Sequence, residues 1–281
     1  MTLGEFLAAR LGRILLFFAG GAAGALFLAA TGTQTGVLLL LALVILPAFL
    51  GVQASDFLRQ RNRIRELEGL LSTTDENSEI YAANHSGGAP VALSGDTAAL
   101  LDRALQLCRR TAGALDVTIY PVVRAWGFTT GGGRVPDRAE LDGLLERVDY
   151  ARVALSGSTL TLPEGMELDL GAVAKGYTGD ALMDLLEEEG VASAIVELGG
   201  NVQALGSKPD GSPWRVAVQA PEGGYAAALE IVDKAVVTSG GYQRFFEQDG
   251  EIYWHIIDPA AGRPARSGLA SVTIVAEEGT L

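Results

Sequence analysis

The sequence predicts an α+β protein whose largely antiparallel sheet has flanking helices and is preceded by two transmembrane helices. Three observations support this prediction. Strand-like and helix-like segments are mixed without a regular βαβ alternation, which favours an antiparallel over a parallel sheet. Glycine or proline turns separate most of the short apolar runs. Finally, the 42 residues between Arg13 and Asp56 carry no charged side chain.

Composition narrows the classes of function. The chain has 281 residues, a net charge of −13, 48% hydrophobic residues and 36 glycines without a three-residue period, so it is neither disordered nor collagen-like. Its single cysteine, Cys108, excludes an internal disulfide framework and a cysteine-cluster metal site. Two histidines argue against a histidine-rich metal cage. The acidic balance argues against nucleic acid as a partner, because a nucleic-acid binder needs a basic face.

Residues 1–58 are predicted to form a membrane hairpin. A spanning helix needs about 20 apolar residues, so a single pass would leave half of the uncharged stretch unexplained. Two short helices, at about residues 14–30 and 37–52, fit it better, with a polar turn at 31–36. A secretory signal peptide fits less well because a second apolar run follows at once. A buried soluble hairpin is the other alternative, but neither segment has a polar face.

Arginines flank both outer ends of the predicted hairpin. Residues 1–65 hold six arginines and two acidic residues, whereas the remaining 216 residues hold 15 basic and 32 acidic side chains. The positive-inside rule then places both flanks, and the soluble body that follows, in the cytoplasm. The lipid bilayer is therefore an expected partner of this chain.

The soluble body is predicted to mix helices and strands. Helical periodicity predicts four helices, at 59–71, 98–111, 141–148 and 172–189. Asp96 or Thr97 is expected to cap the second, in which Cys108 is a packed core thiol rather than a nucleophile. Strands are predicted at 152–155 and 159–162, which form a hairpin, and at 194–197, 202–205, 214–219, 228–231, 235–238, 252–257 and 271–276.

One strand-to-helix turn carries a candidate ligand site. Asp169 ends an apolar segment, and Gly171 and Ala172 then open a helix in which Lys175 is the first cation. Small residues let a ligand approach the backbone N–H groups at the positive end of a helix, which suits a phosphate. A plain turn with a capping aspartate is the alternative, and the spacing is not that of a P-loop.

Three further segments combine glycines or a turn with polar side chains. The paired glycines of 197–201 (ELGGN) allow unusual backbone conformations or a close approach to a ligand. Segment 238–244 (TSGGYQR) places an arginine after Ser-Gly-Gly, where it would wrap a polar ligand. His255 stands before the turn at 258–262, where it would act as a general base or an orienting donor. A simple turn, or a structural histidine, is the alternative in each case.

In combination these segments resemble the FAD:protein FMN transferase family, of the ApbE type. The resemblance covers about residues 64–281 in the family's order. Six segments carry it: 72–84 (STTDENSEIYAAN), 114–128 (ALDVTIYPVVRAWGF), 169–180 (DLGAVAKGYTGD), 194–206, 237–246 and 255–264 (HIIDPAAGRP). None of the six segments is specific to the family by itself, but the occurrence of all six in the family's order is. The resemblance implies an ApbE-like fold, similar to the T-fold, for residues 59–281.

The resemblance implies a Mg²⁺-dependent transfer of FMN from FAD to a threonine or serine hydroxyl of a target flavoprotein, with release of AMP. FAD would be the substrate, and the acceptor flavoprotein the partner. Lys175 and His255 would serve catalysis, His255 by activating the acceptor hydroxyl, and the backbone oxygen of Ala172 would bind Mg²⁺. The FAD contacts that the resemblance implies are Ala114, Leu115, Asp116, Asp169, Lys175 and Ile257.

The sequence departs from the family pattern in three places. An aromatic residue of the first loop aligns with Thr74, so its stacking against the ligand would be lost. The membrane hairpin stands where the first strand of the family is expected. The chain stops at Leu281, where the pattern continues with an aspartate and a threonine that complete the metal site. The flavin transferase domain at 59–281 is therefore expected to be incomplete at its C-terminus.

Two other functions stay open on these grounds. The missing metal ligands favour a non-catalytic, membrane-anchored FAD-binding protein. An FAD pyrophosphatase would need the same metal and only water as acceptor. The membrane side is open as well. The arginine flanks favour the cytoplasmic side of a bacterial inner membrane, whereas the family resemblance favours the periplasmic side.

Overall fold

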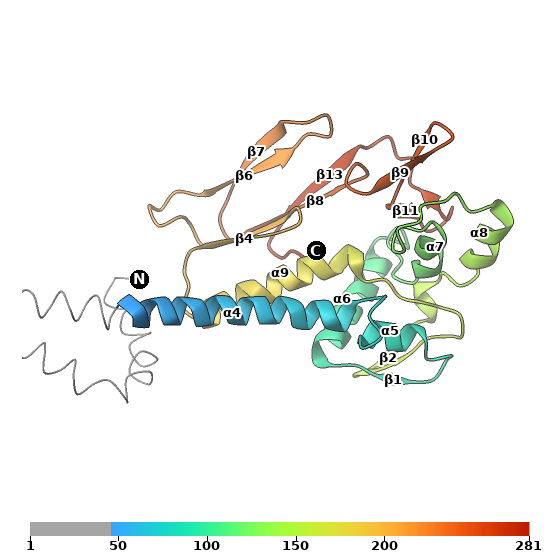
Figure 1. Ribbon diagram of the computed structural model, residues 1–281, viewed down its shortest axis with the longest axis horizontal. Coiled ribbons are helices and arrows are strands. Elements are labelled where there is room, and N and C mark those ends of the chain that lie inside the picture. The colour runs from blue at the N-terminus through green and yellow to red at the C-terminus, as the bar shows by residue number, and fades with distance from the viewer. Residues whose placement is uncertain (1–45, 281) are drawn as a thin grey trace, which may run out of the picture. The chain divides into compact units, whose positions relative to one another are not determined.

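The computed structural model describes residues 46–280 of the chain (Figure 1). These residues divide into two compact units. One contains the described residues up to Arg65 together with Leu185–Ala192, and the other contains Glu66–Asp184 and Ser193 onward. The second unit carries every residue of the predicted site. The first predicted transmembrane helix, residues 14–30, and residues 37–45 of the second lie outside the described residues.

The helix that follows the predicted hairpin is longer than the sequence indicates. Helix α4 spans Leu46–Leu71 without a break, so it joins the end of the predicted 37–52 segment to the predicted helix at 59–71. Within residues 46–280, no helix is both long and apolar enough to cross a membrane.

The remaining helices lie between residues 79 and 188. They are α5 (Glu79–Asn84), α6 (Gly95–Arg110), α7 (Tyr120–Ala125), α8 (Arg138–Leu145), the 3₁₀ turn η2 (Tyr150–Arg152) and α9 (Gly171–Glu188). Three of them, α6, α8 and α9, match predicted helices within a few residues. The predicted cap of α6 is wrong, because the Ser94 hydroxyl accepts the N–H of Thr97 and so starts the helix earlier.

The strands are short, and every strand pair among the described residues is antiparallel. They are β1 (Val91–Ala92), β2 (Ala154–Ser156), β3 (Thr159–Thr161), β4 (Ala194–Leu198), β5 (Asn201–Leu205), β6 (Trp214–Gln219), β7 (Tyr225–Ile231), β8 (Lys234–Gly240), β9 (Phe245–Gln248), β10 (Glu251–Trp254), β11 (Ile257–Asp258), β12 (Arg263–Pro264) and β13 (Ser271–Ala276). The predicted α+β class with antiparallel sheets is therefore confirmed.

The largest sheet has four strands in the order β13-β8-β5-β4. Figure 1 shows its strands β13 and β8 side by side, with the hairpins β6–β7 and β9–β10 beyond it. In the centre of this sheet, Asn201 of β5 pairs with Val237 of β8. A separate small sheet has the order β1-β3-β2 and contains the predicted hairpin.

Two apolar cores support the candidate site. The first packs α6 against the segment before α9 and includes Leu101, Cys108 and Leu168, all fully buried. Burial raises the pKa of the Cys108 thiol, so the prediction of a core thiol is confirmed. The second core is centred on Trp126, which is fully buried and packs beside Val122 and Leu141.

Candidate functional site

Asp169 and the start of α9 are held beside a distant segment of the chain. The backbone N–H of Asp169 donates to the carbonyl of Val117 at 2.8 Å, and Ile119 forms a parallel bridge with Glu167. The strand-like run that ends at Asp169 therefore lies alongside residues 117–119. This pairing brings the 114–116 segment close to the N-terminus of α9.

The Asp169 carboxylate caps α9 and lies close to several charges. Its Oδ1 accepts the N–H of Gly171 at 2.7 Å. Burial raises the pKa of Asp169, while the bond from Gly171 and the electrostatic interactions with Arg244 and His255 oppose that rise. Asp169 is thus partly buried and interacts electrostatically with Arg244 and His255, from the far end of the sequence.

Ala172 and Lys175 are exposed on the first turns of α9. The Lys175 ammonium donates to the carbonyl of Gly199 at 3.2 Å, so it bridges the helix to the turn between β4 and β5. That turn is the ELGGN segment, in which Gly199 and Gly200 adopt φ of 58° and 88°. Such backbone angles favour glycine, which explains the pair.

The 114–116 segment uses its aspartate internally. Ala114 is exposed and Leu115 packs against the first core, whereas Asp116 is buried. Oδ1 of Asp116 accepts the N–H of Thr118 at 2.8 Å and its hydroxyl at 2.6 Å, and Oδ2 accepts the N–H of Tyr150 at 3.0 Å. Both carboxylate oxygens therefore hold the loop in place.

Replacement of Asp116 by alanine is expected to destabilise the fold. It would leave the buried Thr118 hydroxyl and the partly buried Tyr150 N–H without an acceptor, at a cost of about 2–4 kcal/mol in the free energy of unfolding. Urea denaturation measures this loss. Asp102→Ala, an exposed position on α6, is the matched control and should change stability little. Equal stability of the two variants would contradict the structural role of Asp116.

His255 stands between β10 and β11 with its ring tied to Arg244. The Arg244 carbonyl accepts the backbone N–H of His255 at 3.1 Å and lies 3.2 Å from Nδ1. Because a carbonyl only accepts, Nδ1 carries the proton, and the neutral ring presents the lone pair of Nε2. Phe128 meets the ring edge-on, with centroids 6.5 Å apart.

Burial and charge keep His255 neutral. Burial is the main cause that lowers its pKa, and the positive charges of Arg244 and Lys175 lower it further. The bond to the Arg244 carbonyl and the negative charge of Asp169 act in the opposite direction. The structure therefore brings Asp169, Lys175 and His255 into one electrostatic environment, although 86 residues of sequence separate the first from the last.

Ile257 and several aromatic side chains pack in the region of His255 and stabilise it. Ile257 of β11 pairs with Pro264 of β12 and packs on the Trp126 core. Tyr253 and Phe246, opposite each other on the β9–β10 hairpin, stack with centroids 5.3 Å apart. Trp126 lies 5.4 Å from the Tyr253 ring and donates its indole N–H to the Gly262 carbonyl at 2.8 Å.

Two further residues, one of them outside every segment singled out for its chemistry, position this site. Asn84, at the end of α5, accepts the N–H of Leu168 at 2.7 Å and donates to its carbonyl at 2.9 Å. It therefore fixes the residue before Asp169. Arg244 lies in the predicted 238–244 segment, but only the fold places it beside His255. Thr74, the departure in the first loop, is exposed and its N–H bonds Ser72.

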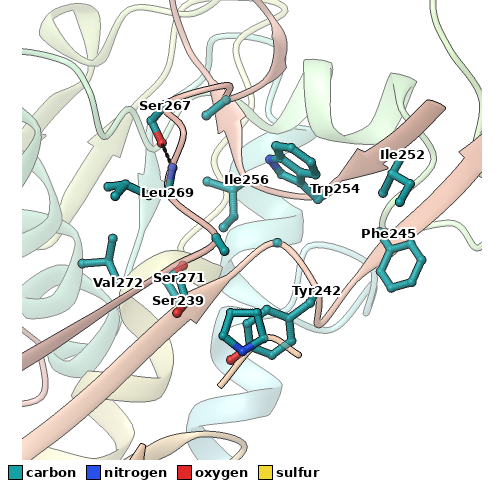
Figure 2. A pocket seen from close by; sticks show the side chains of 14 residues that line it. Ser239, Tyr242, Phe245, Ile252, Trp254, Ile256, Ser267, Leu269, Ser271 and Val272 are labelled. Carbon is teal, nitrogen blue, oxygen red and sulfur yellow. Dashed lines mark hydrogen bonds between the residues drawn. The ribbon is translucent and has the colours of Figure 1, made fainter. Parts of the chain in front are cut away.

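An apolar cavity of about 390 Å³ lies on the opposite face of the β9–β10 hairpin. Figure 2 shows Trp254, Ile252 and Phe245 on one side of it and Leu269 and Val272 on the other. Strand alternation explains the separation, because the neighbouring residues Tyr253 and Phe246 point into the Trp126 core. The cavity lining contains none of the residues predicted for catalysis, FAD binding or magnesium, although Ser239, Gly241 and Tyr242 of the 238–244 segment line it.

The described residues offer magnesium an incomplete ligand set. Residues 46–280 hold no group of three or more histidine, cysteine, aspartate or glutamate side chains arranged for a metal ion. The Asp180 carboxylate, which follows Ala172 on the same helix α9, already accepts the N–H groups of Gly279 at 2.6 Å and Thr280 at 3.0 Å, and also the Thr280 hydroxyl. Magnesium prefers several oxygen ligands, and here the Ala172 carbonyl is the only predicted one.

Comparison with known proteins identifies the family of this chain. Residues 42–281 match the sequence model described as the ApbE family. Two curated relatives, from Vibrio cholerae and Treponema pallidum, carry the name FAD:protein FMN transferase. The chain is 36% identical to the first over 220 residues and 38% identical to the second over 237 residues. These alignments cover 75% and 77% of this chain, and 66% of each relative, so the chain spans slightly less than two thirds of their length.

Solved structures give the same result. The ApbE protein of Thermotoga maritima matches with a TM-score of 0.78 and 32% identity, covering 81% of this chain and 75% of the other. The flavin transferase ApbE from Vibrio cholerae matches with a TM-score of 0.73 and 32% identity, covering 81% of this chain and 74% of the other.

Proposed function

We propose, since this chain belongs to the ApbE family, that it transfers FMN from FAD to a threonine or serine hydroxyl of a target flavoprotein and releases AMP. The observation that supports this most is the meeting of Asp169, Lys175, Arg244 and His255 in one electrostatic environment. Cations beside a helix N-terminus suit the paired phosphates of a dinucleotide. A neutral histidine beside them suits the activation of a hydroxyl.

The proposed reaction is a single displacement at the FMN phosphorus. The acceptor hydroxyl gives its proton to Nε2 of His255 while its oxygen forms a bond to that phosphorus. The bond between the same phosphorus and the bridging oxygen breaks, and AMP leaves with that oxygen. Lys175 and Arg244 stabilise the negative charge that develops on the phosphate oxygens. The Gly199 carbonyl, which Lys175 contacts at 3.2 Å, keeps the ammonium in place.

We also propose that this FMN transfer depends on Mg²⁺. The Ala172 carbonyl would be one of the ligands of the ion. When bound, Mg²⁺ would neutralise charge on the diphosphate. A non-catalytic FAD-binding protein is the second candidate. An FAD pyrophosphatase, which uses water in place of the acceptor, is the third.

One assay separates these three functions. The full chain, purified in detergent, is incubated with FAD, MgCl₂ and an acceptor protein that carries the threonine. Protein-bound flavin fluorescence in a denaturing gel, together with AMP release, is the result expected for transfer. AMP without labelled protein would indicate hydrolysis, and FAD binding without AMP would indicate the non-catalytic function. Addition of EDTA should abolish transfer, and unchanged transfer in EDTA would contradict magnesium dependence.

Replacement of Lys175 by alanine is expected to weaken FAD binding. The variant removes one charge-assisted contact to the diphosphate, which corresponds to about 1.5–3 kcal/mol of binding free energy. Titration of flavin fluorescence measures the change, and Lys208→Ala, in the turn before β6, is the control. Equal affinities of the two variants would place Lys175 outside the site.

Membrane attachment of residues 1–58 and a location in a bacterial inner membrane are likewise proposed. The arginine flanks favour a cytoplasmic soluble domain and the family favours a periplasmic one. Reporter fusions at residue 65 decide between them. Activity of an alkaline phosphatase fusion indicates the periplasm. Fluorescence of a green fluorescent protein fusion indicates the cytoplasm, because this reporter does not fluoresce when it is exported in unfolded form.

A further inference from the structure

Asn201 is a buried side chain whose hydrogen-bonding groups have no partner among the described residues. It is only 2% exposed, and neither the nitrogen nor the oxygen of its carboxamide makes a hydrogen bond. An unpaired buried amide is costly, and nearly all buried polar groups in folded proteins are paired. The observation does not depend on which position is assigned to the amide nitrogen and which to the oxygen. With the two exchanged, one donor group and one acceptor would still be unpaired.

The position of Asn201 is fixed by its neighbours on both sides. Gln203, two residues later on β5 and on the same face of the strand, donates its amide to the Gly176 carbonyl of α9 at 3.1 Å. The carbonyl of Gly199, two residues earlier, accepts a hydrogen bond from the Lys175 ammonium at 3.2 Å. Asn201 therefore lies between two contacts to adjacent residues of α9, and its side chain faces the first turns of that helix.

The unused groups of Asn201 indicate the chemistry of the ligand. Its donor hydrogens require an acceptor, and its oxygen requires a donor. The diphosphate of a dinucleotide supplies only acceptors at neutral pH, and an apolar group supplies neither. A phosphate with a neighbouring sugar hydroxyl supplies both. Lys175 and the positive end of α9, on the same side, favour the negative charge of the phosphate.

We propose that the Asn201 carboxamide binds FAD at its diphosphate, with the amide N–H donating to a phosphate oxygen and the amide oxygen accepting a sugar hydroxyl. This inference rests on the proposed use of FAD. It adds Asn201 to the binding residues and gives the ELGGN turn a function, because the glycines bring the start of β5 close to Lys175. Asn201 makes this contact itself and takes no part in proton transfer.

Asn201→Leu is the informative variant, because leucine has nearly the same size and removes the unpaired polar groups. Ligand-free stability should stay equal or rise, as expected when unsatisfied groups become apolar. Affinity for FAD and for ADP, measured by calorimetry on the full chain, should fall roughly 10- to 100-fold. Affinity for riboflavin, which has no phosphate, should change little.

Gln203→Leu is the matched control on the same face of β5. It removes an amide that does have a partner, so it should lower stability. If Asn201→Leu lowers stability as Gln203→Leu does and leaves FAD affinity unchanged, Asn201 is structural and the inference is wrong. If the affinities for FAD and riboflavin fall equally, the diphosphate assignment is wrong. Absence of FAD binding by the unmodified chain would instead reject the proposed function.

Discussion

Replacement of His255 by alanine should lower the rate of FMN transfer by about 10²–10⁴-fold while FAD still binds. The variant removes Nε2, the only group in the proposed reaction that takes the acceptor proton. The phosphate contacts of Lys175 and Arg244 remain. The loss should therefore fall on the rate of transfer at saturating FAD rather than on the dissociation constant of FAD.

The pH dependence of transfer tests the same role. The folded protein lowers the pKa of His255, so the ring stays neutral at a pH where an ordinary histidine, with a value of 6.5, is already half protonated. Transfer should fall with decreasing pH only as the pH passes through this lowered value. The acid limb of the rate profile is thus expected below pH 6.5.

His85 provides the matched control, because it is the other histidine of the chain. It follows α5, is exposed, and stacks on Tyr81 with centroids 3.9 Å apart. His85→Ala should transfer FMN at the unmodified rate. A loss as large as that of His255→Ala, or an acid limb that persists without His255, would contradict the proposed base.

Replacement of Trp126 by alanine should have the largest effect on stability. Trp126 is fully buried, donates to the Gly262 carbonyl at 2.8 Å and contacts three aromatic rings. Loss of a buried indole costs about 3–5 kcal/mol in the free energy of unfolding. Because Phe128 and Tyr253 support the loop of His255, the variant should also weaken FMN transfer at temperatures where it remains folded.

Trp254→Ala is the control for this variant. Trp254 is half-buried beside the apolar cavity, where the guanidinium of Arg266 lies 4.5 Å from the ring centroid. Its removal should cost less than half as much as removal of Trp126, by the same denaturation measurement. Equal losses would mean that the Trp126 core does not dominate the stability of this region.

Several strands can be predicted from the sequence, because their local pattern of apolar and polar residues coincides with the burial of those residues in the fold. The bounds predicted for 214–219 and 271–276 are those of β6 and β13. The short helices α5 and α7 escape prediction. Each has six residues, too few for helical periodicity, and packing of buried residues such as Ile80 and Val122 stabilises them. The cap of α6 escapes because Ser94, Asp96 and Thr97 are all competent caps.

The candidate site is less predictable because its geometry comes from long-range pairing. Nothing local to Val117 indicates that its carbonyl binds the N–H of Asp169, or that Asn84 fixes Leu168. Asp116 shows the limit of a family resemblance, since the resemblance implies an FAD contact while both oxygens of this carboxylate bond groups inside the protein. Arg244 and Asn201 stand in segments that the pattern marks, yet only the fold gives them neighbours.

Hydrogen–deuterium exchange of the full chain, with and without FAD, tests most directly whether these distant segments form one binding site. FAD should slow exchange together in residues 114–118, 169–176, 199–203 and 255–258. Residues 267–272, beside the apolar cavity, should exchange as before. Protection confined to the cavity, or to one of the four segments alone, would contradict a single binding site.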